Sequence, residues 1–320
     1  MNNEIFISLT SADAAIAEAL RIAIREFLGD KIKVFFSTSK ELQGGVRHGE
    51  DWFQWIVDRV KGCDFALVLI TPSSVHKPWI LWESGAIYGV AMATGSHMLR
   101  KIRPVVYQVD ADQIPSPIRE SKAQFKRGDR AEEVEILFRE ILDQYRDLLP
   151  TDRLLALSKQ MDAVIEAYLK QVDSALIMAG LLELADDYLQ TNVKEWPERI
   201  KLKNEAAHKM ADYVITNSIS KERLAYADHE GLLLALAAAI CAYPEKDDIN
   251  FLVRVANKVK RLHVKYRILL AIDTLFQSDY ISKEFTPSIE QILEKYSYKA
   301  DKPLLNRIEQ LRYTMQIKGK

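Results

Sequence analysis

The stretch "DFALVLITPSSVHKPWILWESGAIYGVA", residues 64–91, decides the fold. Residues 64–72 form a continuous apolar run, which is typical of a strand in a parallel sheet that is covered on both faces. After a polar turn, residues 78–93 have the apolar spacing of a helix. A buried strand that leads into a helix in this way is the building unit of an α/β sheet.

The alternation of strand and helix patterns extends over the first 148 residues. Further strands are expected at 4–9, 33–37 and 103–109, and further helices at 12–29, 52–62 and 131–148. Residues 114–129 are irregular, with at most one short helix and one short strand. The pattern predicts a flavodoxin-like open parallel sheet with helices on both faces, in which ligands bind at the carboxyl ends of the strands.

The strand pattern nearly stops after Pro150. Helices are expected at 152–171, 173–190, 197–217, 229–242, 247–260, 263–278, 285–297 and 302–316. From Gly231 onward, two helices recur about every 35–40 residues, which is compatible with an α-solenoid and equally with an irregular bundle. We therefore expect two domains: an α/β domain at 1–149 and an all-helical domain at 150–320.

Composition and charge argue against several classes of protein. The 320 residues carry 44 Lys and Arg against 45 Asp and Glu, a net charge of −1, which argues against a mainly electrostatic nucleic-acid or membrane binder. Cys63 and Cys241 lie far apart and form no disulfide framework. The first ten residues lack the pattern of a signal peptide, and the most apolar run, 231–243, indicates a buried core helix because a membrane span needs about 20 residues. A cytoplasmic location is expected.

Glu83 interrupts an otherwise apolar helix face that it shares with Trp79, Ala86, Ile87 and Val90. A carboxylate on such a face is unfavourable to bury without a partner. It can be a structural acid, favoured near a helix start or paired with an Arg, or it can be a functional group. A second stripe, formed by Gly85, Gly89 and Ala93, predicts close packing of this helix on the sheet.

The loop 37–51 follows a predicted strand and so lies at the ligand end of the sheet. It contains Lys40, Arg47, His48 and three glycines, and cations together with free backbone N–H groups can hold phosphates. The loop matches neither of the common glycine-rich phosphate motifs, so that, taken alone, it is better interpreted as a surface loop. His48 and His76 have no partner at metal-ligand spacing, and no metal site is expected.

Three segments in this order resemble a Toll/interleukin-1 receptor (TIR) domain: "IFISLTSAD", "VFFSTSKELQGGVRHGEDW" and "CDFALVLITPSSVHKPWILWESGA". Asp13 ends the first segment at the acidic position that the family expects. The resemblance covers residues 1–148. Two departures are present: the second segment's loop, the BB loop of the family, is longer than usual, and the Phe-Trp box that closes receptor-type TIR domains is absent.

The resemblance implies an NAD(+) glycohydrolase of the enzymatic branch of the family, because Glu83 falls on the glutamate that this branch requires. Trp79 matches an aromatic residue near the dinucleotide. Further contacts with NAD are expected from the end of the first strand and from the loop: Phe6, Leu9, Thr10, Ser11, Lys40, Arg47 and His48. The products are nicotinamide and ADP-ribose or a cyclic isomer, and NAD is a substrate, so no cofactor is expected. The family acts after TIR–TIR assembly, which implies an oligomer and a role as an effector of bacterial antiphage defence. The resemblance also implies that residues 1–149 are the catalytic domain and that residues 150–320 are a sensor or oligomerisation domain, which an activating ligand or partner would bind.

The chemistry agrees with a single carboxylate. Nicotinamide leaves a cationic N-glycoside as a neutral molecule, so no general acid is needed, and one carboxylate can stabilise the oxocarbenium-like transition state. Two alternatives remain at this point. One is a non-enzymatic TIR scaffold for protein–protein signalling. The other is an enzyme that resembles nucleoside deoxyribosyltransferases and forms a covalent glycosyl-enzyme on the glutamate.

Overall fold

The computed structural model describes residues 3–39, 45, 51–93, 102–119, 125–191, 193 and 195–318. The contacts within the chain divide it into two compact units, Met1–Ala179 and Gly180–Lys320. We describe each unit by itself.

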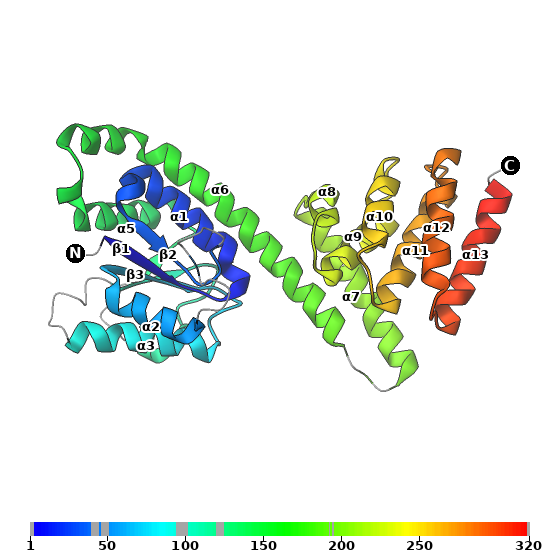
Figure 1. Cartoon of the computed structure of the whole chain (residues 1–320), viewed down its shortest axis with the longest axis horizontal. Helices are drawn as coiled ribbons and strands as arrows, with labels where there is room; N and C mark the ends of the chain where they lie inside the picture. The colour runs from blue at the N-terminus through cyan, green and yellow to red at the C-terminus, as the bar shows by residue number, and fades with distance from the viewer. Residues whose placement is uncertain are drawn as a thin grey trace. The chain divides into compact units, whose positions relative to one another are not determined.

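The first unit is built on a five-stranded parallel sheet (Figure 1). Its strands are β1 (Glu4–Ser8), β2 (Lys33–Phe35), β3 (Phe65–Ile70), β4 (Ile102–Val106) and β5 (Lys126–Arg127). They lie in the order β2-β1-β3-β4-β5, and this order is that of flavodoxin-like folds. The predicted fold class of this part of the chain is confirmed.

Helices cover both faces of this sheet (Figure 1). One face carries α1 (Ala14–Leu28), α5 (Ala131–Gln144) and the first part of α6 (Thr151–Gln190), and it buries Ile5 and Ile7 of β1. The other face carries α2 (Trp52–Gly62) and α3 (Pro78–Ala93) and buries Phe6. Since successive side chains of a strand point to opposite faces, Ser8 lies on the same face as Phe6.

Local signals place the helix ends. The Asp51 carboxylate caps α2 by accepting hydrogen bonds from the backbone N–H groups of Phe53 and Gln54 at 2.9 and 3.1 Å. Gly29 follows α1 with a φ of 63°, a conformation that favours glycine. The irregular segment holds the expected short helix, α4 (Ser116–Arg119), and the short strand β5.

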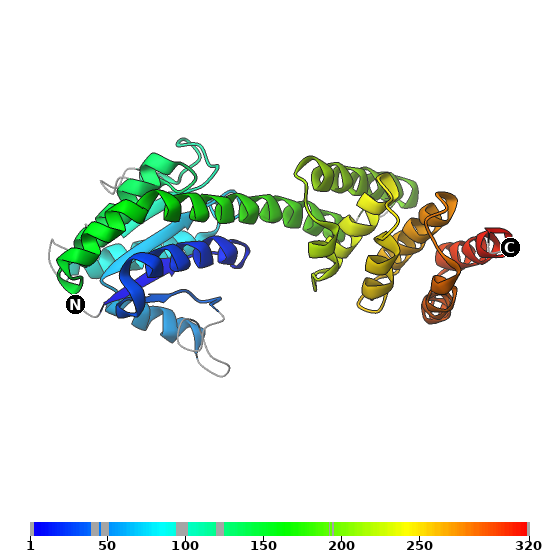
Figure 2. The same ribbon diagram turned by 90° about the horizontal axis from the view of Figure 1, so that it is seen from above.

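Two details of the sequence-based prediction were wrong. Residues 151–190 form one helix, α6, rather than two, because no glycine or proline lies near residue 172 and the apolar spacing continues through it (Figure 2). The stripe of Gly85 and Gly89 on α3 does not pack closely on the sheet. Both glycines are exposed, and a Cβ atom added to either would meet nothing within 4 Å.

The first part of α6 packs on the first unit. Its inward residues share the core that α1 and α5 form, and they follow one another at three- and four-residue spacing: Leu157, Met161, Ile165, Tyr168, Val172, Ala175 and Leu176. The Tyr168 hydroxyl lies 2.7 Å from the hydroxyl of Tyr107, and both side chains are buried. Because of this packing, the first unit ends at Ala179. The boundary at 149/150 that the sequence predicts concerns the end of the α/β domain alone, and it stays a prediction.

The second unit is all-helical. After the end of α6 it contains α7 (Trp196–Thr216), α8 (Lys221–Ala225), α9 (Glu230–Ala242), α10 (Asp248–Ala256), α11 (Leu262–Gln277), α12 (Thr286–Ser297) and α13 (Lys302–Lys318). Only the short α8 lacks a counterpart among the predicted helices. In one row α9 packs between α7 and α11, and α11 packs on α13, while α8, α10 and α12 form a second row. Two rows of this kind are the arrangement of an α-solenoid.

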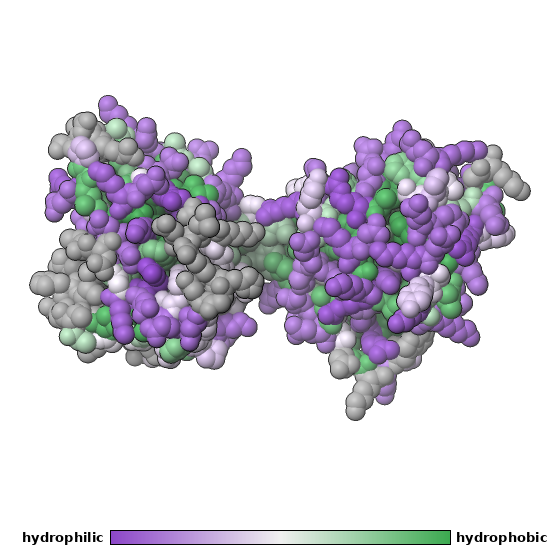
Figure 3. Space-filling view, viewed as in Figure 1, coloured by the Kyte–Doolittle hydropathy of each residue, from purple (hydrophilic) through white to green (hydrophobic). Residues whose placement is uncertain are grey.

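Helix α9 is the centre of the helical unit. Its residues from Gly231 to Ile240 are buried on all sides, which confirms the predicted core helix. Hydrophilic residues cover most of the face of this unit that Figure 3 shows. Within the described part of the chain, no helix has both the length and the apolar character that crossing a membrane requires.

Candidate functional site

The candidate site is centred on Glu83 of α3. A tight turn leads into this helix: the Ser74 hydroxyl accepts from the Thr71 backbone N–H at 2.8 Å and donates to the Leu69 carbonyl at 3.0 Å. This turn connects the end of β3 to Pro78, the first residue of α3. The second turn of the helix therefore lies near the carboxyl end of the sheet, where α/β folds bind ligands.

Glu83 is 2% exposed, and neutral donors hold both of its carboxylate oxygens. The Trp79 indole Nε1 donates to Oε1 at 2.7 Å, from one turn earlier in α3. The Ser8 hydroxyl, on the last residue of β1, donates to Oε2. Among the described residues, Glu83 forms no ion pair with a cation. The described contacts therefore do not support a structural pair between Glu83 and an Arg.

Burial raises the pKa of the Glu83 carboxyl to about 7, although the hydrogen bonds from Ser8 and Trp79 oppose the shift. A carboxyl with a pKa near neutrality can exchange a proton under physiological conditions. In its ionised form it can stabilise positive charge that develops on a bound molecule. Carboxyl groups perturbed by burial in this way are enriched at functional sites.

An aromatic cluster adjoins the carboxyl. Trp79 stacks on Trp82 with ring centroids 4.7 Å apart, and Trp52 of α2 lies 4.4 Å from Trp79. Phe53 lies 5.3 Å from Trp82. Trp52, Phe53 and Trp82 are 44%, 49% and 40% exposed, so these large apolar rings are open to solvent in the described structure. Aromatic faces of this kind stack on planar rings and attract cations.

Asp13 organises a second polar cluster at the same end of the sheet. It is 1% exposed and accepts hydrogen bonds from the hydroxyls of Thr71 and Ser73 at 2.8 Å each. The Thr10 hydroxyl donates to its other oxygen at 2.7 Å. These bonds tie the loop after β1 to the loop after β3, so that both flank the first turns of α3.

The structure brings some of the predicted site residues together and separates others. Trp79 contacts Glu83 directly, and Phe6 lies on the same face of the sheet, where its ring packs edge-on against Trp55 at 6.5 Å. Leu9 packs instead into the core formed by α1, α5 and α6. Thr10 belongs to the Asp13 cluster, and Ser11 is exposed. Lys40, Arg47 and His48 lie outside the described residues.

Sequence reasoning missed Ser8 and the aromatic neighbours of Trp79. The sequence could have indicated Ser8. Side chains alternate between the two faces along the strand "IFISL", and this alternation places the polar Ser8 on the face that α3 covers. The two segments "DWFQW" and "PWILW" each begin a helix with closely spaced aromatic residues. Only the packing of α2 beside α3 brings these two segments together.

The order of strands, the buried glutamate of α3 and the Asp13 cluster at the strand ends can now be compared with known families. Residues 5–140 match the family model of the TIR domain. The match runs from β1 into α5 and covers Glu83, Trp79, Ser8 and Asp13, so the resemblance at the level of the TIR domain is confirmed. No curated protein matches the chain. The TIR domain family includes NAD-hydrolysing enzymes as well as scaffolds.

Proposed function

We propose that the TIR domain of this protein cleaves NAD(+) between nicotinamide and ribose, with Glu83 as the catalytic residue. The observation that carries the proposal is the Glu83 carboxyl, which is buried beside an aromatic cluster at the carboxyl end of a TIR-type sheet. Its hydrogen bonds to Ser8 and Trp79 fix the orientation of both oxygens. Preorganised groups of this kind lower a barrier without reorganisation at the moment of reaction.

The proposed reaction needs only one carboxylate. The bond between ribose C1′ and the nicotinamide nitrogen breaks, its electron pair neutralises the pyridinium, and nicotinamide leaves as a neutral molecule. Ionised Glu83 stabilises the positive charge that develops on the ribose. A water molecule then bonds to C1′ and loses a proton to solvent, which gives ADP-ribose. Attack by an adenine nitrogen in place of water gives the cyclic isomer.

Substrate entry requires a rearrangement at the site, because Glu83 is 2% exposed. Trp79 is the side chain whose movement would uncover the carboxyl, since its indole contacts one of the two oxygens. Assembly of TIR domains through the exposed rings of Trp52, Phe53 and Trp82 is a means of producing that movement. We propose that NAD cleavage depends on such assembly and serves as a cytoplasmic defence response.

Nicotinamide release from NAD(+) tests the proposal, with the wild-type chain compared with Glu83→Gln over a wide range of protein concentrations. We expect the variant to lose roughly 100- to 1,000-fold of the rate, because the charge stabilisation of the transition state is removed. Wild-type turnover per chain should rise with protein concentration if assembly opens the site. The matched control is Glu26→Gln on the exposed face of α1, which should keep the full rate. Equal rates for Glu83→Gln and the wild type would contradict the assignment.

A scaffold without enzymatic activity is the second candidate, and the exposed aromatic cluster favours it. Replacing Trp82 by Ala in a folded chain separates the two. In a scaffold this change abolishes self-association, Glu83→Gln leaves self-association intact, and neither the wild-type chain nor either variant releases nicotinamide. In the proposed enzyme, both changes reduce nicotinamide release, and only the Trp82 change alters the concentration at which the rate rises.

A further inference from the structure

The helical unit contains a pocket of ≈ 800 Å³ that the TIR domain does not share. Its wall is formed by the end of α6 and the first turns of α7, α11 and α13. The described residues that line it include four cations and three aromatic rings: Arg199, Lys203, Arg267, Lys302, Tyr188, His263 and Tyr266. Volumes of this size are typical of small-molecule sites.

Among the described residues that line this pocket, positive charge exceeds negative charge. Asp301 is the one acidic residue among the described lining residues, and its carboxylate caps α13 by accepting from the Leu304 backbone N–H at 3.1 Å. Arg267 is 9% exposed, and its guanidinium donates to the Asn204 side-chain oxygen, a neutral acceptor. Within the described part of the chain, Arg267 and Lys203 form no ion pair with an acidic side chain. A buried guanidinium without an anionic partner is unfavourable, and a bound anion would remove that penalty.

Two lining residues have lowered pKa values, for which burial is the largest cause and the neighbouring cations are the next. Burial lowers the pKa of Lys203, and the neighbouring Arg199 and Arg261 lower it further. Burial together with the charges of Lys203 and Arg261 lowers the pKa of His263 to about 4, and the opposing effect of Glu230 is smaller. His263 is therefore neutral at physiological pH, and its buried Nε2 atom has no hydrogen-bond partner among the described residues.

Aromatic rings lie directly beside these cations. The Lys203 ammonium sits 5.3 Å from the centre of the Tyr188 ring, and the rings of Tyr188 and His263 are 5.4 Å apart. Tyr266 lines the same pocket one turn further along α11. Cationic side chains bind phosphate groups, and planar bases stack on aromatic rings.

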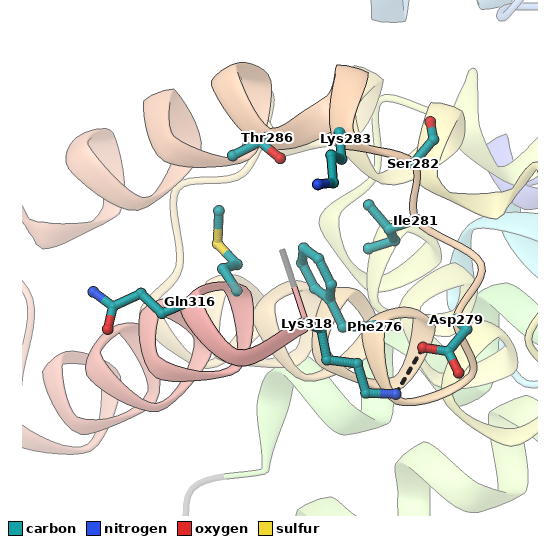
Figure 4. A pocket seen from close by; sticks show the side chains of 9 residues that line it. Phe276, Asp279, Ile281, Ser282, Lys283, Thr286, Gln316 and Lys318 are labelled. Atoms are coloured by element: carbon teal, nitrogen blue, oxygen red, sulfur yellow. Dashed lines mark hydrogen bonds and ion pairs between the residues drawn. The ribbon is translucent and has the colours of Figure 1, made fainter. Parts of the chain in front are cut away.

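We propose that this pocket of the helical unit binds a nucleotide, with Arg199, Lys203 and Arg267 holding its phosphates and the ring of Tyr266 contacting its base. The proposal rests on the helical unit alone and does not depend on the activity of the TIR domain. The other pocket described in this unit offers a contrast (Figure 4). It measures ≈ 480 Å³, and its Lys318 ammonium is already paired with Asp279 at 2.8 Å.

Isothermal titration calorimetry on the full chain tests the proposal with three probes: ADP, inorganic pyrophosphate and adenosine. We expect ADP to bind to one site and pyrophosphate to bind more weakly than ADP. Adenosine should bind with an affinity at least about tenfold lower than that of ADP, because it lacks the phosphates. No saturable binding of ADP or pyrophosphate at millimolar concentration would overturn the proposal. Equal affinities for adenosine and ADP would refute the role of the cations, and equal affinities for pyrophosphate and ADP would refute the role of the ring.

Single substitutions then locate the site. Arg199→Ala and Lys203→Ala should each weaken ADP binding about tenfold while leaving the thermal unfolding temperature close to that of the wild type, because neither side chain is fully buried. The matched controls are Lys201→Ala, which is exposed on the same helix and paired with Glu205, and Lys283→Ala in the other pocket. Binding that survives both pocket variants unchanged, or that the controls weaken equally, would place the nucleotide elsewhere and refute the assignment.

Discussion

At the scale of single residues, the functional question centres on how Glu83 is held. Its carboxyl sits between an indole from its own helix and a serine that ends β1. Burial and these two donors act on its pKa in opposite directions, and burial is the stronger effect. The residue is therefore no solvated surface acid, and it forms no ion pair with any residue that the structure describes, so its two neighbours can control its protonation state.

Removal of the Ser8 hydroxyl should shift the pH profile of NAD cleavage. The reaction needs ionised Glu83, so the wild-type rate should rise with pH and level off above about pH 7. In Ser8→Ala a hydrogen bond that favours the ionised form is lost, so the pKa should rise and the rising limb should move to higher pH. The control is Ser84→Ala, whose hydroxyl donates to the Ile80 carbonyl and does not contact Glu83. A profile that stays in place in Ser8→Ala would contradict the coupling.

Protein stability should report the same carboxyl independently of activity. Because the folded-state pKa of about 7 exceeds the ordinary value of 4.5, the folded chain binds more protons than the unfolded chain between these values. The contribution of Glu83 to stability is thus fully present below about pH 4.5 and is lost as the pH rises to about 7. Denaturant unfolding of Glu83→Gln should show a stability gain over the wild type that grows between pH 4 and pH 8 by on the order of 3 kcal/mol. A pH-independent difference would contradict the raised pKa.

At the scale of elements, α6 and the pair α2–α3 cover opposite faces of the sheet and have different roles. The first part of α6 covers the sheet face opposite the site and completes the core around α1 and α5. Helices α2 and α3 cover the other face and contribute the aromatic cluster and Glu83. One face of the sheet is thereby closed by a packed layer, and the other carries the groups that can meet a substrate or a partner.

Met161→Ala tests whether α6 is part of the first unit. Met161 is 2% exposed in the core shared with α1 and α5, so its truncation should destabilise this unit by roughly 2–5 kcal/mol. Asp162 is the next residue of the same helix and is exposed, so Asp162→Ala should change the stability by less than about 0.5 kcal/mol. Thermal or denaturant unfolding measures both. Equal effects of the two changes would mean that α6 does not pack on this core.

At the scale of the whole molecule, the chain combines a TIR domain with a two-row helical unit, and each has its own candidate site. The TIR domain carries a buried carboxyl for which we propose NAD chemistry. The helical unit carries a cationic, aromatic pocket for which we propose nucleotide binding. The two proposals stand on different residues and fail separately.

Truncation should separate the two units at the place where the contacts divide. A chain ending at Ala179 keeps the part of α6 that packs on the sheet and should unfold cooperatively. A chain ending at residue 149 uncovers the apolar core beneath α6, so it should be markedly less stable or aggregate. Circular dichroism melts of the two chains make the comparison. Equal stability would show that the α/β domain ends at 149, as the sequence pattern predicts.

The sequence by itself determined the fold class and most of the elements. Hydrophobic periodicity is a local property, so it identified the strands, the amphipathic helices and the buried helix α9, and it marked Glu83 as a charge on an apolar face. Only the tertiary structure decided that Ser8 and Trp79 hold that carboxyl, and that Leu9 packs in the opposite core. It also decided that cations of α7, α11 and α13 share one pocket in a chain of nearly balanced charge. Such groupings join residues distant in sequence, and packing rather than local pattern brings them together.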